Sequence, residues 1–325
     1  MAPPPALVRS ARCLWHWQWL QLMNGLGPAD AGGHYRRPAG AFAALPPLPG
    51  DADGPGSHVL IVGRSCPWAH RAWLVWCLRH LQSSIELVVV EPDPQAGRWR
   101  FSVPFDGCDT LAALYRRSGA AAAVRATVPA LYSRSQNRIL VSESARLIEL
   151  LNRWPQSPGA APLDLEPPGQ AAATAHWREQ LQHKVNDGVY RCGFARSQSA
   201  YDQAEAELFD TLQQADTTLA TRPGSWLSGE TLSLADVVLF PTLIRLEQVY
   251  GPLFGCSRVP LWQLPALWQW RARFHGLDGV QDTCWPEAWR RDYFGALFPL
   301  NPGGLVPAGP PLATLVQELP ACADE

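Results

Sequence analysis

The sequence has no Cys-x-x-Cys pair, only one lysine, and no apolar run of about 18 residues, the length a membrane-spanning helix requires. We therefore expect no membrane span. The net charge is −2, and no basic footprint for nucleic acid is present. We therefore expect no nucleic-acid partner.

Cysteine is also sparse, with eight residues spread over 325 positions. This is not the density of a disulfide framework, so we expect a reduced, cytoplasmic compartment. Cys66 and His70 lie four residues apart, as many metal ligands do, but no second pair completes a site. We expect no metal.

One cysteine stands out by its position. A short apolar strand over residues 58–63 leads into an amphipathic helix over 67–81, and Pro67 suits the first helical position, which makes Cys66 the N-cap. Free N–H groups and the helix dipole favour negative charge there, so we predict a lowered thiol pKa. The alternative is a small buried cysteine before a proline that merely starts a helix. Position 69 is alanine, so there is no second cysteine three residues after Cys66 to form a dithiol pair. The chemistry indicated is therefore that of a single cysteine working with an external thiol.

The rest of the first half follows the thioredoxin-type order of strand, helix, strand, helix, hairpin and helix. The strand over 85–91 is apolar enough to be buried on both faces. The remaining elements are expected near 110–117, 129–133, 138–141 and 143–153.

The second half lacks strand signals and is predicted to be all helical. It follows a Pro-rich linker over 154–169, and Ser233 and Asp236 form a candidate capping box. Helices are expected near 171–187, 198–220, 233–250 and 263–275. The predicted division is an extended Pro/Gly-rich leader (1–57), a thioredoxin-like domain (58–154), a helical domain (170–295) and a C-terminal tail (296–325).

The leader is expected to lack regular structure, with periodicity beginning near His58. Its three alternate tryptophans, Trp15, Trp17 and Trp19, suggest packing on the protein body, cover for a subunit surface, or an interfacial anchor.

A thioredoxin-like domain with an N-cap cysteine, joined to a helical domain, resembles the glutathione transferase superfamily. The string from Cys66 to Arg71 narrows the resemblance to the glutathionyl-hydroquinone reductases, the Xi class. Further segments that resemble this family are Arg125-Ala126-Thr127-Val128-Pro129-Ala130-Leu131, Ser142-Glu143-Ser144, residues 186–195 and residues 300–310.

The resemblance implies glutathione as co-substrate, contacted by Trp99, Arg125, Ala126, Thr127, Val128, Glu143 and Ser144. A cis bond before Pro129 would turn the Val128 backbone toward an extended peptide, although a proline at a strand edge fits equally. Glu143 and Ser144 open a helix whose N–H groups suit a carboxylate, or they are an ordinary helix start. Instead of contacting glutathione, Trp99 could be a packed core aromatic and Arg125 an ordinary surface arginine.

The resemblance also implies three tyrosines on the hydroquinone side. Tyr190 matches the proton donor, whereas Tyr250 and Tyr293 match residues that lower the thiol pKa; alone, each reads as a core tyrosine. The family's His-Tyr-Tyr is Asp292-Tyr293-Phe294 here, which bears on substrate range and rate.

We therefore expect a homodimeric, glutathione-dependent reductase of glutathionyl-hydroquinones that works through a mixed disulfide at Cys66. The alternatives are an omega-like thioltransferase or dehydroascorbate reductase, and a non-catalytic binding or scaffold protein that kept the fold. The physiological quinone is not readable from the residues.

Overall fold

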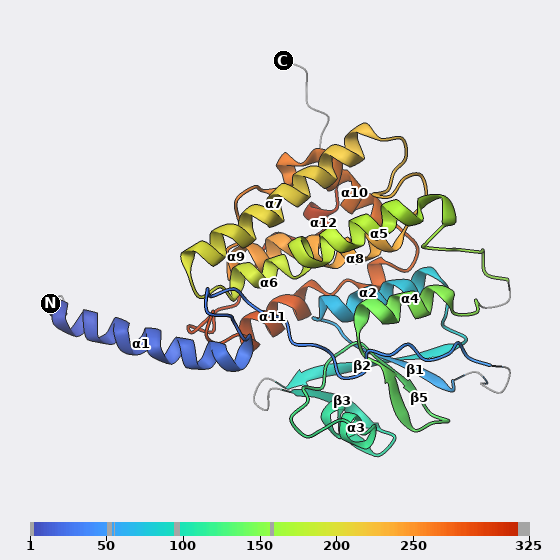
Figure 1. The fold of residues 1–325 in the computed structure, drawn as a ribbon, viewed down its shortest axis with the longest axis horizontal. Helices are drawn as coiled ribbons and strands as arrows, with labels where there is room; N and C mark the ends of the chain where they lie inside the picture. Colours follow the sequence, from blue (N-terminus) through green and yellow to red (C-terminus); the bar gives the residue numbers. More distant parts are fainter. Residues whose placement is uncertain (1–2, 51–53, 55, 94–97, 157–158, 318–325) are drawn as a thin grey trace.

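The computed structural model describes residues 3–50, 54, 56–93, 98–156 and 159–317. A sheet with helices on both faces lies beside a larger helical half (Figure 1), as the sequence predicts. The first half consists of β1 (His58–Gly63), α2 (Pro67–Leu78), β2 (Ile85–Asp93), β3 (Arg98–Phe105), β4 (Cys108–Thr110), α3 (Leu111–Arg117), β5 (Ala130–Ser133), β6 (Arg138–Val141) and α4 (Ser144–Arg153).

The sheet has the strand order β4-β3-β2-β1-β5-β6. β1 and β2 are parallel and are joined through α2, while the other neighbouring pairs are antiparallel. β1 lies near the middle, and all six of its residues are buried. The first turn of α2 therefore follows a strand that is buried along its whole length.

The hairpin β3–β4 is absent from the sequence prediction. Its signal was present as alternating apolar residues, since Trp99, Phe101, Val103 and Phe105 are two apart. Arg98, Arg100 and Pro104 obscure the alternation, and Val103 is 74% exposed. The hairpin extends the sheet and brings Trp99 next to the turn after β1.

The predicted burial of β2 on both faces is wrong. Ile85 and Val90 are buried, but Glu86 is exposed and the three residues between them are only half-buried. The reason is that β2 pairs with β1 over residues 85–90 but with β3 only over residues 91–93, so among the described residues no strand lies on the second edge of 87–89.

The second half is helical throughout the described residues, apart from an isolated bridge between Trp226 and Gly229. The N–H of Ser233 donates to Asp236 Oδ2 at 3.0 Å, which confirms the capping box. Its elements are η1 (Pro168–Gln170), α5 (Ala171–Gln180), η2 (Leu181–Asn186), α6 (Gly188–Gly193), α7 (Gln198–Thr221), α8 (Leu234–Leu243), η3 (Leu246–Tyr250), α9 (Gly251–Phe254), η4 (Leu261–Gln263), α10 (Pro265–His275), η5 (Gln281–Thr283), α11 (Pro286–Ala296) and α12 (Leu312–Leu315).

Two of the predicted helices change from α-helical to π-helical hydrogen bonding before they end. The helix expected over 171–187 becomes a π-helix at η2, and the one expected over 233–250 is interrupted and ends in a second π-helix, η3. π-helical turns within α-helices are rare and frequently occur at functional sites. Here η2 directly precedes the helix of Tyr190, and η3 contains Tyr250.

The prediction that regular structure begins near His58 is wrong, because the leader forms α1 (Pro5–Leu26). This helix projects from the body in Figure 1. Trp19 is half-buried against the core, and Trp15, although exposed, contacts the Phe298 ring edge-to-face. These two fit the prediction of packing on the body, whereas Trp17 is exposed. None of the helices described is long and apolar enough to cross a membrane.

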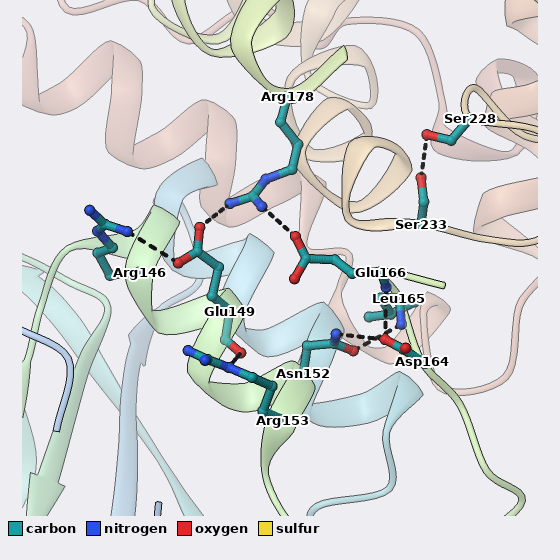
Figure 2. Close-up of polar contacts among 10 residues, drawn as sticks. All are labelled: Arg146, Glu149, Asn152, Arg153, Asp164, Leu165, Glu166, Arg178, Ser228 and Ser233. Atoms are coloured by element: carbon teal, nitrogen blue, oxygen red, sulfur yellow. Dashed lines mark hydrogen bonds and ion pairs between the residues drawn. The ribbon is translucent and has the colours of Figure 1, made fainter. Parts of the chain in front are cut away.

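The two halves meet at an ion-pair network, seen in Figure 2. Arg178 on α5 donates to Glu149 on α4 at 2.6 Å and to Glu166 in the linker at 2.7 Å. Asn152 on α4 donates to Asp164 at 3.0 Å and accepts from the Leu165 N–H at 2.9 Å. The linker is thus fastened to both halves. The four-part division of the chain and the homodimer stay predictions.

Candidate functional site

Cys66 is the N-cap of α2, as predicted, and Pro67 occupies the first helical position. The Cys66 Sγ lies 3.5 Å from the Val128 carbonyl oxygen, to which the thiol can donate. The sequence folds this way locally because proline has no N–H to leave unpaired at the start of a helix. The thiol therefore lies at the helix N-terminus, facing the segment before β5.

The prediction of a lowered thiol pKa is wrong for the protein in this structure. Burial raises the pKa of Cys66, and this effect outweighs the backbone N–H groups of Ala69 and Trp68, which lower it. The charges of Arg37 and Arg245 also act to lower the pKa. The helix terminus acts in the predicted direction, but desolvation of the thiolate is larger.

A cavity of about 700 Å³ opens beside Cys66. Its lining comes from both halves of the fold and from the leader, and it is partly apolar with several polar groups at the wall. This combination is typical of a small-molecule site at a domain boundary.

One wall of the cavity comes from the segment before β5 and from the β3 hairpin. Trp99, Arg125, Thr127 and Val128 line it, whereas Ala126 is not a lining residue. The Val128–Pro129 peptide bond is cis. Trp99 packs on Gly63, where a Cβ would lie 2.6 Å from the indole ring. Only a glycine at the end of β1 admits this ring to the cavity wall.

Glu143 and Ser144 line the same wall at the start of α4. The Ser144 hydroxyl is buried and has no hydrogen-bond partner among the described residues. A buried polar atom without a partner is costly, and a bound polar ligand would satisfy it. The Glu143 side chain is close to the leader, because a Cβ on Gly40 would lie 3.1 Å from Glu143 Oε2. These groups suit the α-amino and carboxylate end of a γ-glutamyl peptide.

The three predicted tyrosines meet, although they come from three separate elements. The hydroxyl oxygens of Tyr190 and Tyr293 are 2.5 Å apart, and those of Tyr250 and Tyr293 are 3.3 Å apart. Tyr190 and Tyr293 line the cavity, while Tyr250 lies behind them, fully buried. The Tyr190 ring stacks on Trp68, two residues after Cys66.

Burial raises the pKa of all three phenols, most strongly for Tyr190 and Tyr293, whose neighbouring tyrosines add to the effect. A phenol with a raised pKa keeps its proton at neutral pH and can donate it. The Cys66 thiol and the protonated hydroxyls of Tyr190 and Tyr293 therefore line the same cavity.

The altered triplet divides between the cavity and the core. Asp292 lines the cavity and is bonded to Arg291 at 2.9 Å, while Phe294 is buried. The position that carries histidine in the family thus contributes a carboxylate to the wall, and the second hydroxyl is replaced by a core phenyl ring.

The leader supplies lining residues that the sequence prediction missed. Tyr35, Arg37 and Gly40 line the cavity. The Arg37 guanidinium lies 3.4 Å above the Trp68 ring and bonds to Asp187 at 3.2 Å. No local pattern marks these residues, since their role depends on where an irregular segment crosses the fold.

Comparison with known families assigns both halves. The family described as "Glutathione S-transferase, N-terminal domain" matches residues 65–154, and "Glutathione S-transferase, C-terminal domain" matches residues 198–273. The fold predicted from sequence, a thioredoxin-like domain followed by a helical glutathione transferase domain, is confirmed.

Two curated relatives are similar over most of their length. Glutathionyl-hydroquinone reductase PcpF of Sphingobium chlorophenolicum is 33% identical over 79% of this chain and 83% of its own. Glutathionyl-hydroquinone reductase YqjG of Escherichia coli is 30% identical over 91% of this chain and 93% of its own.

Solved structures agree with this placement. The glutathione transferase Xi of Phanerochaete chrysosporium has a TM-score of 0.81 at 29% identity, covering 90% of this chain and 97% of that chain. The glutathione-bound structure of YqjG has a TM-score of 0.71 at 30% identity, covering 78% and 84%. The chain belongs to the family of the glutathionyl-hydroquinone reductases, the Xi class of the glutathione transferases.

Proposed function

We propose that this protein is a glutathione-dependent oxidoreductase that reduces glutathionyl-hydroquinones to hydroquinones. The observation that carries the proposal is the joint placement of the Cys66 thiol and the Tyr190–Tyr293 hydroxyl pair on one cavity. The reaction requires a sulfur nucleophile and a proton donor that can both reach the same bound substrate.

Glutathione in the conjugate would bind along Val128, with its γ-glutamyl end at Glu143 and Ser144. Support comes from the unpartnered Ser144 hydroxyl and from the half-buried Glu143 carboxylate at the same wall. Arg125 and Trp99 would add a cation and an indole N–H. The quinol ring would then lie toward Tyr190 and Tyr293.

In the first step the Cys66 thiolate attacks the glutathione sulfur. The bond from that sulfur to the ring carbon breaks, its electron pair goes to the carbon, and the carbon takes a proton from Tyr190. The products are the hydroquinone and a disulfide between Cys66 and glutathione.

In the second step the thiolate of another glutathione attacks that disulfide at the glutathione sulfur. Glutathione disulfide leaves, and Cys66 returns as a thiolate. The two electrons gained by the hydroquinone therefore come from the thioether sulfur of the conjugate and from the thiol of the second glutathione, and the proton of that thiol restores Tyr190.

A relative named as an omega-like glutathione transferase, from Schizosaccharomyces pombe, is 28% identical over 77% of this chain, and this favours thioltransferase or dehydroascorbate reductase activity as the second candidate. Those reactions need the cysteine but no proton donor to carbon, so the paired phenols on the cavity wall would have no function in them. A non-catalytic scaffold would need neither feature.

The test is turnover of glutathionyl-menadiol with glutathione, comparing the wild type with Cys66→Ala. We expect turnover that is lost in the variant, and a mass increase of one glutathione on Cys66 when the second glutathione is withheld. Cys284→Ala is the matched control, because this half-buried thiol does not line the cavity. Full activity in Cys66→Ala would contradict the mechanism. Reduction of hydroxyethyl disulfide without turnover of the conjugate would favour the thioltransferase.

A further inference from the structure

Arg245 is a fully buried cation that does not line the cavity. Its guanidinium lies 4.1 Å from the Trp289 ring centroid, and its Nε has no hydrogen-bond partner among the described residues. No carboxylate of the described chain forms an ion pair with it. Buried charges are normally paired, so this one calls for an explanation.

The donors of Arg245 end on both sides of the nucleophile. One guanidinium nitrogen donates to the Arg64 carbonyl at 3.3 Å, two residues before Cys66. The other donates to His70 Nδ1 at 2.9 Å, one helical turn after Cys66, and to the Pro241 carbonyl at 2.9 Å. Arg245 therefore fastens the helical half to the turn that presents the thiol.

The hydrogen bonds of His70 indicate that its ring is neutral, so it does not add a charge beside Arg245. The Thr283 hydroxyl donates to the Val280 carbonyl at 2.6 Å, so its oxygen accepts from His70 Nε2, 2.7 Å away. His70 Nδ1 is then left as a lone pair that accepts from Arg245. Burial, together with the charge of Arg245, lowers the pKa of His70 well below its usual range, in agreement with a neutral ring.

Arg271 is a second buried arginine in this half of the fold, and its surroundings differ from those of Arg245. Arg271 is equally buried and lies 4.3 Å from the Trp268 ring, but Glu247 neutralises it at 2.8 Å. Arg71 is also buried and lies 4.4 Å from the Trp68 ring. It donates to Gln182 at 2.9 Å, and the charges of Asp187 and Glu143 act on it. Of these three buried, ring-stacked arginines among the described residues, Arg245 is the one that lacks an acidic neighbour and donates to the turn at Cys66.

We propose that Arg245 is a positioning residue whose uncompensated charge is balanced by the thiolate of Cys66 when that thiolate forms. In this arrangement the anion that completes the ion pair is the nucleophile itself. The inference rests on the proposed role of Cys66 as nucleophile.

The other groups that face Cys66 cannot replace this charge. Tyr115, Tyr190 and Tyr250 are phenols whose pKa is raised, so they are neutral at neutral pH. Arg37 also acts on Cys66 but is already paired with Asp187. Arg245 is thus the unpaired cation of this set, and it also faces Tyr250 and Cys284, which are neutral.

The test is the pH dependence of Cys66 alkylation by iodoacetamide in the full-length protein, followed at the Cys66 peptide by mass spectrometry. We expect Arg245→Met to raise the midpoint by about one pH unit, which is about tenfold slower alkylation at a fixed pH below both midpoints. Arg245→Lys keeps the charge and should restore most of the shift. Arg271→Met should lower the thermal midpoint and leave the alkylation midpoint unchanged.

An alkylation midpoint that Arg245→Met leaves unchanged would overturn the inference, as would an equal shift in Arg271→Met. Should Arg245→Met fail to fold, the neutral Arg245→Gln variant, which retains a donor, is read in the same way. The assay uses no hydroquinone conjugate, so failure of the proposed reaction with an intact midpoint shift would be recognised as a separate result.

Discussion

The hydroxyls of Tyr190 and Tyr293 share a hydrogen bond of 2.5 Å although 103 residues separate them in the chain. Tyr293 also contacts the buried Tyr250 hydroxyl at 3.3 Å, so the pair at the cavity wall is backed by a third phenol. The three hydroxyls form a chain of hydrogen bonds. When the hydroxyl at the cavity gives up its proton, the phenolate that remains can accept a hydrogen bond from its neighbour and is stabilised by it.

Replacing Tyr190 by phenylalanine removes the hydroxyl and leaves the ring on Trp68. We expect kcat for glutathionyl-menadiol to fall about 100-fold, the usual scale of a general acid. Glutathione affinity should change little, because the groups proposed to bind it, Val128, Glu143 and Ser144, do not include the Tyr190 hydroxyl. Tyr201→Phe is the control, since that hydroxyl donates to the Gly255 carbonyl at 2.6 Å and does not line the cavity. Equal kcat in both variants would remove Tyr190 from the mechanism.

Replacing Glu143 by glutamine tests the γ-glutamyl end of the site. A hydrogen bond to a charged group contributes about 1.5–3 kcal/mol, so we expect the Kd for glutathione to rise about 10-fold to 150-fold. Isothermal titration calorimetry measures it directly. Glu179→Gln changes an exposed carboxylate outside the cavity and should leave the Kd unaltered. Unchanged affinity in Glu143→Gln would place the ammonium elsewhere.

The tyrosine cluster should make the fold sensitive to alkaline pH. Burial raises the pKa of Tyr190, Tyr250 and Tyr293 above the usual value of 10.0, and raises that of Cys77 and Cys284 to about 12. The unfolded chain therefore loses these protons first as the pH rises, so the stabilisation is complete below the unfolded pKa values and declines above them. We expect the thermal midpoint to fall between about pH 9 and pH 11.

The same pH series on Tyr250→Phe provides the control. This variant lacks one of the titrating phenols, so its thermal midpoint should decline less steeply with pH than that of the wild type. A thermal midpoint that rises or stays level over this range in the wild type would contradict the assignment of raised pKa values.

The elements that were predictable are those set by neighbours in the chain. The helix start at Cys66 and Pro67 and the capping box of Ser233 and Asp236 depend on residues within one turn, and both are confirmed. The β3 hairpin was missed because arginines and a proline interrupt its alternation. α1 was missed because the Pro/Gly-rich stretch beside it dominates the composition of the leader.

By itself the sequence determined which chemistry the chain could hold: a lone cysteine at a helix N-terminus, next to a proline that starts that helix. The tertiary structure alone decided that burial raises the thiol pKa, that Arg37 of the leader lies on Trp68, and that Arg245 is buried with no acidic partner among the described residues. Capping and periodicity are local, so sequence reports them. Desolvation and charge balance depend on contacts between residues more than a hundred positions apart, and only packing fixes those.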